Sequence, residues 1–389
     1  MSGDGEFVES GSFRVDRKRA LSKLERYKLP DLELGFYFWI RAARAAGVKR
    51  FEASHSARTL DIRFDGKPFK GGELSDPYGG LFDGGDPRRK HLGLGLLWLL
   101  RAGAAAVSVS SGGLRLSVDS LERDRLERDP AGPKETVVSA RWTGLLRSFQ
   151  GSPWRLSAGT VAGRCPLPGM TIVVAGKEAK PDPFHRGEWV HEFKSGAVRG
   201  VMSPPNGSEP ESWVTHSVLG VRADDSRYKP RTMPCFAFAD SPALRLDASE
   251  FKVVKNEALD ELHERVAREE KNLLEKMLRF VEHGNWVEEF RDGLMGACWL
   301  LLKNPKTDSR DPLLKRLWRA PLARDERGNP HSLLKALENP EAAFFSSDRE
   351  PSPRCGRVGR YAPASGSRRR SSPSAKASTG CFCSASSSG

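Results

Sequence analysis

A stretch rich in glycine and proline, residues 65–89, constrains the fold of this chain more than any other feature, because of what flanks it. Before it come a very apolar segment over 34–46, which has the length of a helix, and two alternating segments over 50–54 and 59–64, which have the period of strands. After it, residues 91–104 are again apolar over a helical length. This order predicts a sheet covered by helices, with a long flexible loop over 65–89 between its two halves.

The rest of the chain divides by composition. Strand patterns dominate 151–253, and helical patterns dominate 254–345, above all an amphipathic stripe over 256–283. The segment 346–389 is rich in serine and arginine, which predicts a disordered basic tail. We therefore expect an α+β fold with a first domain over 12–150, a strand-rich second region, a helical C-terminal region and the tail.

The net charge of +13 favours a nucleic-acid partner less than its size suggests. Seven basic side chains and no acidic one follow Glu350, so the tail accounts for more than half of the excess. A small remainder spread over a large body is typical of a solvated surface. No window approaches the roughly 20 apolar residues of a membrane span, so a cytoplasmic protein with no membrane partner is expected.

Neither the cysteines nor the histidines have the spacing of a metal site. Cys165, Cys235 and Cys298 are isolated in apolar or turn contexts, which is typical of buried free thiols, and the chain has no CxxC pair. The histidines do not group as ligands. This spacing predicts no structural zinc site. No serine stands in a Gly-x-Ser-x-Gly context, so no hydrolase triad is predicted either.

Three short motifs carry the candidate chemistry: one after the second strand, one at the start of the following helix, and one at the start of a later strand. Their residues are Asp65, Gly66, Lys90, Gly93, Gly95, Leu96 and Thr136. Glycines are needed where the backbone must come close to phosphates. The N-terminus of a helix supplies N–H groups and positive potential to the same anions.

In order and spacing these motifs resemble the ATP-binding domain of the GHKL superfamily, which includes gyrase, heat-shock chaperones, histidine kinases and MutL. The resemblance implies an α/β sandwich of the Bergerat type over 12–150 and ATP as the ligand. It implies that Asp65 accepts a hydrogen bond from the adenine amino group, that Gly93 and Gly95 approach the phosphates, and that Thr136 lies near the adenine. Residues 70–91 would form a lid that closes over the nucleotide.

The chain departs from the family where hydrolysis needs it most. Counting back from Gly47, the family's general base falls at Phe38, its magnesium-binding asparagine at Ala42 and a further acid at Ala45. A hydrolytic enzyme of this kind needs a carboxylate to activate water and an oxygen ligand for magnesium. We therefore predict no catalytic residue, no protein ligand for a magnesium ion, and hydrolysis that is weak or absent.

Three functions remain open. The first is a chaperone-like or regulatory ATP-binding protein, monomeric or oligomeric, in which the nucleotide changes a surface offered to a protein partner or client. The second is a nucleotide-free scaffold or interaction protein that keeps the architecture because it packs well. The third is a nucleic-acid-associated protein of MutL or gyrase kinship, which the basic tail would favour.

Overall fold

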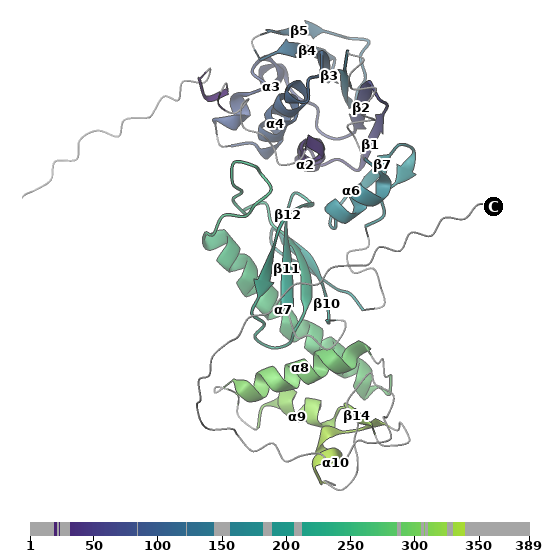
Figure 1. Cartoon of the computed structure of the whole chain (residues 1–389), viewed down its shortest axis with the longest axis vertical. Coiled ribbons are helices and arrows are strands. Elements are labelled where there is room, and N and C mark those ends of the chain that lie inside the picture. Colours follow the sequence, from purple (N-terminus) through teal and green to yellow (C-terminus); the bar gives the residue numbers. More distant parts are fainter. Residues whose placement is uncertain are drawn as a thin grey trace, which may run out of the picture.

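The computed structural model is an α+β protein with two lobes (Figure 1). It describes residues 19–21, 23, 32–83, 85–121, 123–143, 156–181, 189–205, 212–285, 289–304, 307, 310–324 and 330–338. The predicted tail over 346–389 lies outside these residues. One lobe is an α/β sandwich, and the other joins a second sheet to a long helix and to the C-terminal helices.

The first lobe is built on a mixed sheet of eight strands. In spatial order they are β5 (Arg123–Arg128), β4 (Leu114–Ser120), β3 (Ala106–Ser111), β6 (Thr136–Arg141), β2 (Thr59–Phe64), β1 (Arg50–His55), β7 (Thr171–Val174) and β8 (Lys177–Glu178). β1 and β7 pair in parallel, and the other neighbours are antiparallel. Because β7 and β8 complete this sheet, the first lobe extends past the boundary predicted at residue 150.

Alternation along the strands turns one face of this sheet inward. β1, β2, β3 and β6 bury every second side chain, as the sequence pattern predicts. Two helices cover the inward face: α2 (Phe36–Ala45), which follows the 3-10 helix η1 (Leu32–Gly35), and α4 (Pro87–Arg101). The short helix α6 (Ala158–Arg164) lies beside β7. The edge strand β5 is exposed and almost wholly charged, which opposes pairing with another chain.

The prediction of a flexible loop over 65–89 is wrong, because short helices form within this segment. It contains α3 (Gly71–Ser75) and the 3-10 helix η2 (Gly79–Leu81), and Leu74 and Tyr78 in it are buried. α4 begins at Pro87, four residues earlier than predicted, with Asp86 as its N-cap. Dense glycine and proline predict turns, whereas packing of η2 against α4 and of α3 against β4 stabilises helices too short to form alone.

Gly93 and Gly95 therefore lie inside α4 and do not open it. A Cβ atom at Gly95 would lie 2.6 Å from the ring of Trp39 in α2, and one at Gly93 would lie 3.0 Å from the carbonyl oxygen of Pro77. Both distances are shorter than ordinary packing allows. The two glycines thus let α4 approach its neighbours closely.

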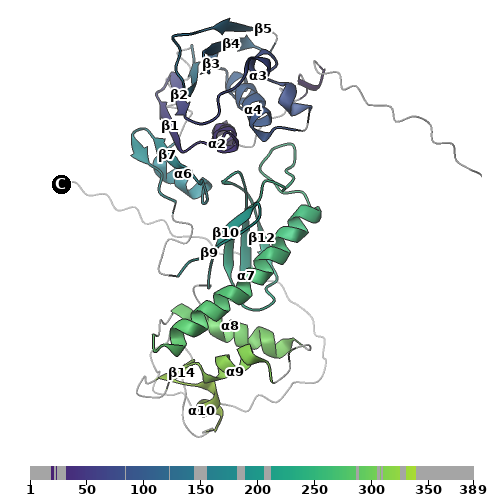
Figure 2. The same ribbon diagram turned by 180° about the vertical axis from the view of Figure 1, so that it is seen from behind.

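The second lobe combines a sheet of five strands with helices (Figure 2). The strand order is β12 (Val221–Tyr228), β11 (Ser212–Val218), β13 (Phe236–Asp240), β10 (Val198–Ser203) and β9 (His191–Ser195), with β11 and β13 parallel. The long helix α7 (Glu257–Glu282) packs against this sheet, and Asn256 caps it by accepting the Leu259 N–H at 3.1 Å. The predicted amphipathic helix over 256–283 is confirmed.

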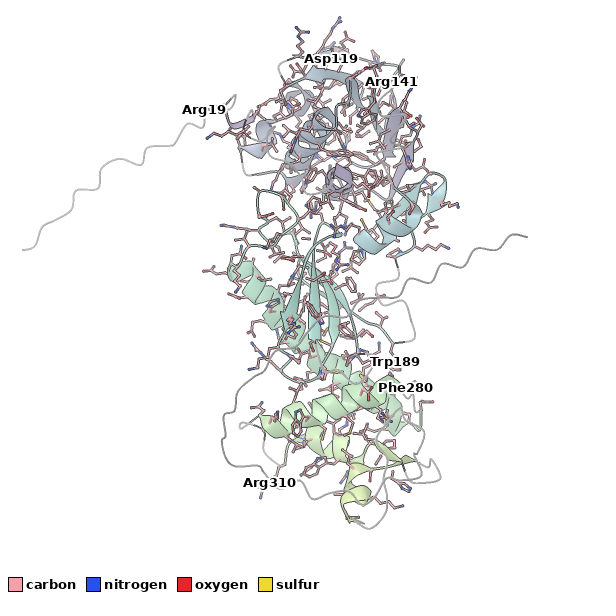
Figure 3. All side chains as sticks on the ribbon, viewed as in Figure 1. Arg19, Asp119, Arg141, Trp189, Phe280 and Arg310 are labelled. Carbon is pink, nitrogen blue, oxygen red and sulfur yellow. The ribbon has the colours of Figure 1, made fainter. Side chains whose placement is uncertain are left out.

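Smaller elements complete the second lobe. They are α8 (Glu289–Lys303), α9 (Pro312–Arg319), α10 (Leu333–Glu338) and the ribbon of β14 (Ala323–Arg324) with β15 (Pro330–His331). Trp189 joins the sheet to the helices, because its ring lies 4.6 Å from that of Phe280 and 4.4 Å from that of Phe290 (Figure 3). One apolar core runs through the sheet, α7, α8 and α9, so the predicted strand-rich and helical regions form a single lobe.

The state of the cysteines and the hydrophobicity of the helices can be compared with the sequence predictions. Cys165, Cys235 and Cys298 are buried free thiols, as expected. Within the described residues, no helix combines the length and the apolar character that crossing a membrane requires.

Replacing Gly95 by alanine tests the role of the helix glycines. Gly95→Ala pushes a methyl group into Trp39, so we expect it to lower the free energy of unfolding by about 1–3 kcal/mol. Gly163→Ala in α6 is the matched control, because its Cβ meets no atom within 4 Å and alanine favours helix. Urea unfolding measures both. A Gly95→Ala protein as stable as the parent would contradict the packing role.

Candidate functional site

Arg41 is a cation in the middle of the buried face of α2. It is fully buried, and burial lowers its pKa to about 10 although the charge of Glu250 acts in the opposite direction. Its Nη1 donates to the carbonyl oxygen of Glu250 at 2.7 Å, and its guanidinium lies 5.0 Å from the ring centre of Phe251. Its Nε and Nη2 find no partner among the described residues. The hydrogen bond that this guanidinium makes therefore goes to the second lobe.

The partner of Arg41 is the tip of a hairpin that follows β13. Leu246 and Val253 form an antiparallel bridge at its base, and we call it the 246–253 hairpin. Glu250 at its tip has φ 63°, a left-handed conformation that costs a non-glycine residue about 1–3 kcal/mol. Two contacts from the first lobe hold this residue: Arg41 binds its carbonyl oxygen, and the Lys90 amine lies 2.7 Å from its carboxylate.

Phe251, the next residue, completes the core of the first lobe. It is buried with the residues of α2 and α4, and its ring centre lies 5.6 Å from that of Phe38. Phe38 stacks in turn on His91 at 6.2 Å. Burial, and then the charges of Arg41 and Lys90, hold the pKa of His91 well below its ordinary value, so the imidazole is neutral at pH 7. Phe38 thus contacts one aromatic ring of its own lobe, His91, and one of the other lobe, Phe251.

A second contact joins the lobes at the turn between β11 and β12. The Gly220 N–H donates to Asp240 at 2.8 Å, and a Cβ atom on Gly220 would lie 2.5 Å from the carbonyl oxygen of Leu167. Arg199 binds both Asp240, at 2.9 Å, and the Leu167 carbonyl oxygen. The second lobe therefore approaches the first through two separate turns.

Asp65 and Gly66, which the resemblance assigns to the nucleotide, form a turn at the end of β2. Asp65 Oδ1 accepts the backbone N–H groups of Lys49 and Arg50, at 2.8 and 2.9 Å, and so ties the end of β2 to the start of β1. Gly66 has φ 101°, and a Cβ there would lie 2.9 Å from the Ala46 carbonyl oxygen. This pair closes a tight turn against the end of α2.

Thr136 lies at the same end of the sheet as Asp65, since it pairs with Phe64. It is buried, and its hydroxyl lies 2.8 Å from that of Ser111, which accepts the Phe69 N–H at 3.0 Å. Its polar group is therefore engaged inside the first lobe. Leu96 is likewise buried in the core.

A buried arginine ties the expected lid to the Asp-Gly turn. Arg88, in the first turn of α4, donates to the carbonyl oxygens of Lys67 and Pro68 at 3.0 and 2.9 Å. Its guanidinium also pairs with Glu73 in α3 and lies 4.8 Å from the ring centre of Phe69. These contacts cross-link the segment that the resemblance identifies as a lid.

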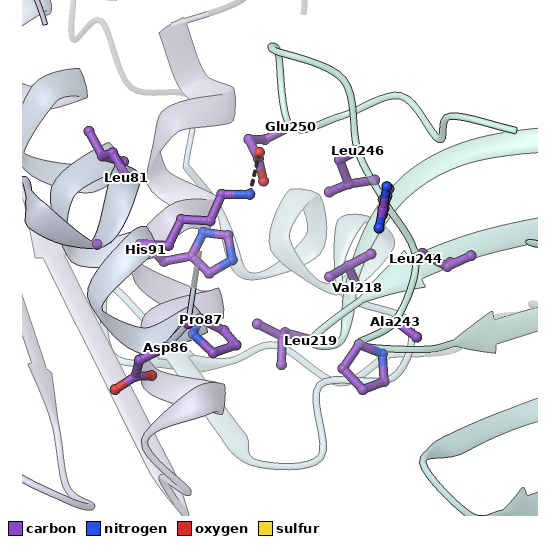
Figure 4. A pocket seen from close by; sticks show the side chains of 15 residues that line it. Leu81, Asp86, Pro87, His91, Val218, Leu219, Ala243, Leu244, Leu246 and Glu250 are labelled. Atoms are coloured by element: carbon purple, nitrogen blue, oxygen red, sulfur yellow. Dashed lines mark ion pairs between the residues drawn. The ribbon is translucent and has the colours of Figure 1, made fainter. Parts of the chain in front are cut away.

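A cavity of about 430 Å³ lies between the two lobes (Figure 4). The start of α4 lines one side, with Pro87, Lys90 and His91, and the β11–β12 turn and residues 242–246 line the other. Among the seven residues predicted to bind nucleotide, Lys90 alone lines this cavity. Lys90 pairs with Glu250 of the second lobe, whereas Asp65 and Thr136 have their partners within the first lobe.

Sequence reasoning missed the residues that form the junction. Arg41 did carry a signal, because it is a charge within the otherwise apolar Phe36–Ala43 segment, and such a charge needs a partner. Glu250 and Phe251 carried none, since their role depends on a hairpin docking about 200 residues away along the chain.

No group of three or more histidine, cysteine, aspartate or glutamate side chains in the described part of the chain could hold a metal ion. His216 and His263 do contact each other, with 3.1 Å between their Nε2 atoms. Burial lowers the pKa of His216 to about 4, so the pair is neutral at pH 7.

Comparisons with known proteins add a single kind of match. No family model matches the chain, and no curated protein matches it. Among solved structures, the chain is similar to the B subunit of DNA gyrase from Myxococcus xanthus, with 12% sequence identity and a TM-score of 0.43. That match covers 68% of this chain and 95% of the gyrase chain.

Truncation of Phe251 tests the junction. Phe251→Ala removes the ring between Phe38 and Arg41, and we expect it to lower the free energy of unfolding by about 3 kcal/mol. Val254→Ala, one residue beyond the same hairpin and 44% exposed, should change it by less than about 0.5 kcal/mol. Urea unfolding of both variants is the measurement, and equal losses would count against a specific role for Phe251.

Proposed function

We propose that this chain is a nucleotide-free interaction protein that does not hydrolyse ATP. In this account the first lobe is a platform, the second lobe docks on it through the 246–253 hairpin, and the assembled pair is offered to a protein partner. The observation that carries the proposal is the environment of Phe38. The side chain at the expected position of the general base packs between His91 and Phe251 of the other lobe.

The engagement of the motif residues supports the same account. Asp65 Oδ1 already accepts two backbone N–H groups, which gives this carboxylate a structural role in the turn between β2 and β1. The Thr136 hydroxyl is engaged with Ser111, and the glycines of α4 face Trp39 and Pro77. Each displaced hydrogen bond would cost about 0.5–1.5 kcal/mol, and more if a buried group lost its partner altogether.

Ala42 supports the absence of hydrolysis in another way. It is fully buried in α2, one residue from Arg41, and a methyl group offers no oxygen to a magnesium ion. A cation placed beside it would also be repelled by the Arg41 guanidinium. At the two positions that the resemblance assigns, Phe38 cannot act as a general base and Ala42 cannot bind a magnesium ion.

A regulatory ATP-binding protein of chaperone-like type is the second candidate, and one observation favours it. Lys90, which the resemblance places at the end of the lid, lines the cavity between the lobes beside the start of α4. In that account phosphates bound near Lys90 would compete with Glu250 for its amine and change the contact between the lobes. The nucleic-acid alternative rests on the tail, which lies outside the described residues, and stays a prediction.

Thermal unfolding with and without ATP and magnesium separates the two candidates. A ligand present at a thousand times its dissociation constant adds about 4 kcal/mol to stability, so micromolar binding would shift the melting temperature strongly at millimolar ATP. We expect no shift. A shift in the parent protein that disappears in both Asp65→Asn and Lys90→Met would establish the regulatory candidate and refute the nucleotide-free one.

A further inference from the structure

We propose that the cavity between the lobes is a binding site for a small organic anion with an apolar body, such as an aryl or alkyl carboxylate or sulfonate. The inference rests on the lining of the cavity and not on the nucleotide motifs. It goes beyond the proposed function, because it assigns a ligand to the junction that the interaction protein would carry.

The walls suit an apolar body. Leu81 and Pro87 from the first lobe face Val218, Leu219 and Leu244 from the second, as Figure 4 shows. Cavities that bind small molecules are lined in this way, mainly apolar with a few polar groups that fix orientation, and are usually about 300–1,000 Å³ in volume. The volume of about 430 Å³ is enough for a molecule of two fused rings or a chain of comparable size.

One cation that lines the cavity has no partner among the described residues. Lys90 is paired with Glu250 at 2.7 Å, and Asp86 caps α4 by accepting the backbone N–H of Arg88 at 2.8 Å. Arg245 also lines the cavity, is exposed, and has no partner for its guanidinium in the part of the chain that the structure describes. A planar guanidinium at the mouth of an apolar cavity fits a carboxylate or sulfonate, which it can bind through two hydrogen bonds.

His91 supplies a second polar feature. It lines the cavity from α4, it is 3% exposed, and its Nδ1 has no partner among the described residues. A buried polar atom without a partner costs about 1–3 kcal/mol, and a ligand that offers it a hydrogen bond recovers part of that cost. Since the imidazole is neutral at pH 7, it neither attracts nor repels the charge of Arg245.

A ligand in this cavity contacts both lobes at once. It lies between the start of α4 and the segment 242–246 that leads into the 246–253 hairpin. Because it binds only when the lobes are docked, it stabilises the docked arrangement by mass action. The junction would then respond to the concentration of the anion, and the surface offered to a partner would respond with it.

The test is a fluorescence titration of the full chain with 8-anilinonaphthalene-1-sulfonate, a dye with an apolar body and one sulfonate that brightens when it leaves water. We expect saturable binding and a parallel rise in melting temperature. Arg245→Glu should weaken the dissociation constant on the order of tenfold or more, because an attraction is replaced by a repulsion. Lys229→Glu is the matched control, since it makes the same charge change on an exposed residue at the far end of β12.

A second pair of variants tests the volume. Ala243 is exposed and lines the cavity, so Ala243→Trp should fill it and abolish dye binding. Ala248→Trp places the same indole on an exposed residue of the same hairpin outside the lining, and it should leave binding unchanged. Thermal unfolding of each variant without dye shows that the fold is retained.

An exposed apolar surface on α8 is an alternative binding place for the dye, and binding there would overturn the proposal. Met295, Trp299 and Leu302 lie exposed on α8 at helical spacing, and a dye could bind there instead. If Trp299→Ser removes the fluorescence while Arg245→Glu and Ala243→Trp keep it, the cavity is not the site. An absence of saturable binding in the parent protein would also refute the proposal, whereas a nucleotide shift in the ATP experiment would leave it standing.

Discussion

The contact between Arg41 and the tip of the 246–253 hairpin is the interaction on which the arrangement of the two lobes depends. Burial of an unpaired guanidinium costs several kcal/mol, so α2 could not keep Arg41 inside without a partner. Glu250 supplies a carbonyl oxygen at 2.7 Å and a carboxylate oxygen at 4.0 Å, and Phe251 supplies a ring face. The left-handed backbone of Glu250 is tolerated because Arg41 binds its carbonyl oxygen and Lys90 binds its carboxylate.

Packing and turn formation explain why glycine and aspartate stand at the motif positions without any phosphate binding. A glycine in a helix allows either a phosphate or another side chain to come close, and the sequence does not distinguish the two. Here α4 begins at Pro87, so Gly93 and Gly95 lie in its second and third turns, where their N–H groups belong to the helix. Trp39 and Pro77 occupy the space that the missing Cβ atoms leave. An Asp-Gly pair is equally ambiguous, because Asp65 can serve a turn as well as an adenine.

Local periodicity predicted the strands β1 and β2 of the first sheet and the long helix α7. β2 spans the predicted residues 59–64, and α7 lies within the predicted 256–283, because alternation and helical periodicity depend on near neighbours in the chain. The short helices α3 and η2 were not predictable, since they depend on packing against distant elements, α3 against β4 and η2 against α4. The boundary of the first lobe was misplaced for a similar reason: β7 joins the sheet through a parallel pairing with β1 across more than 100 residues.

The candidate site was predictable only in part. Phe38 and Ala42 led from residue type alone to the prediction of weak or absent hydrolysis, which stays a prediction, whereas the hairpin that packs against Phe38 had no local signature. The most direct measurement of the central claim is a double-mutant cycle on Phe38→Leu and Phe251→Leu, read by urea unfolding. The account predicts a coupling energy of about 0.5–1.5 kcal/mol between the two rings. Additive losses, with coupling below about 0.3 kcal/mol, would contradict the claim that α2 holds the second lobe at the position expected for the general base.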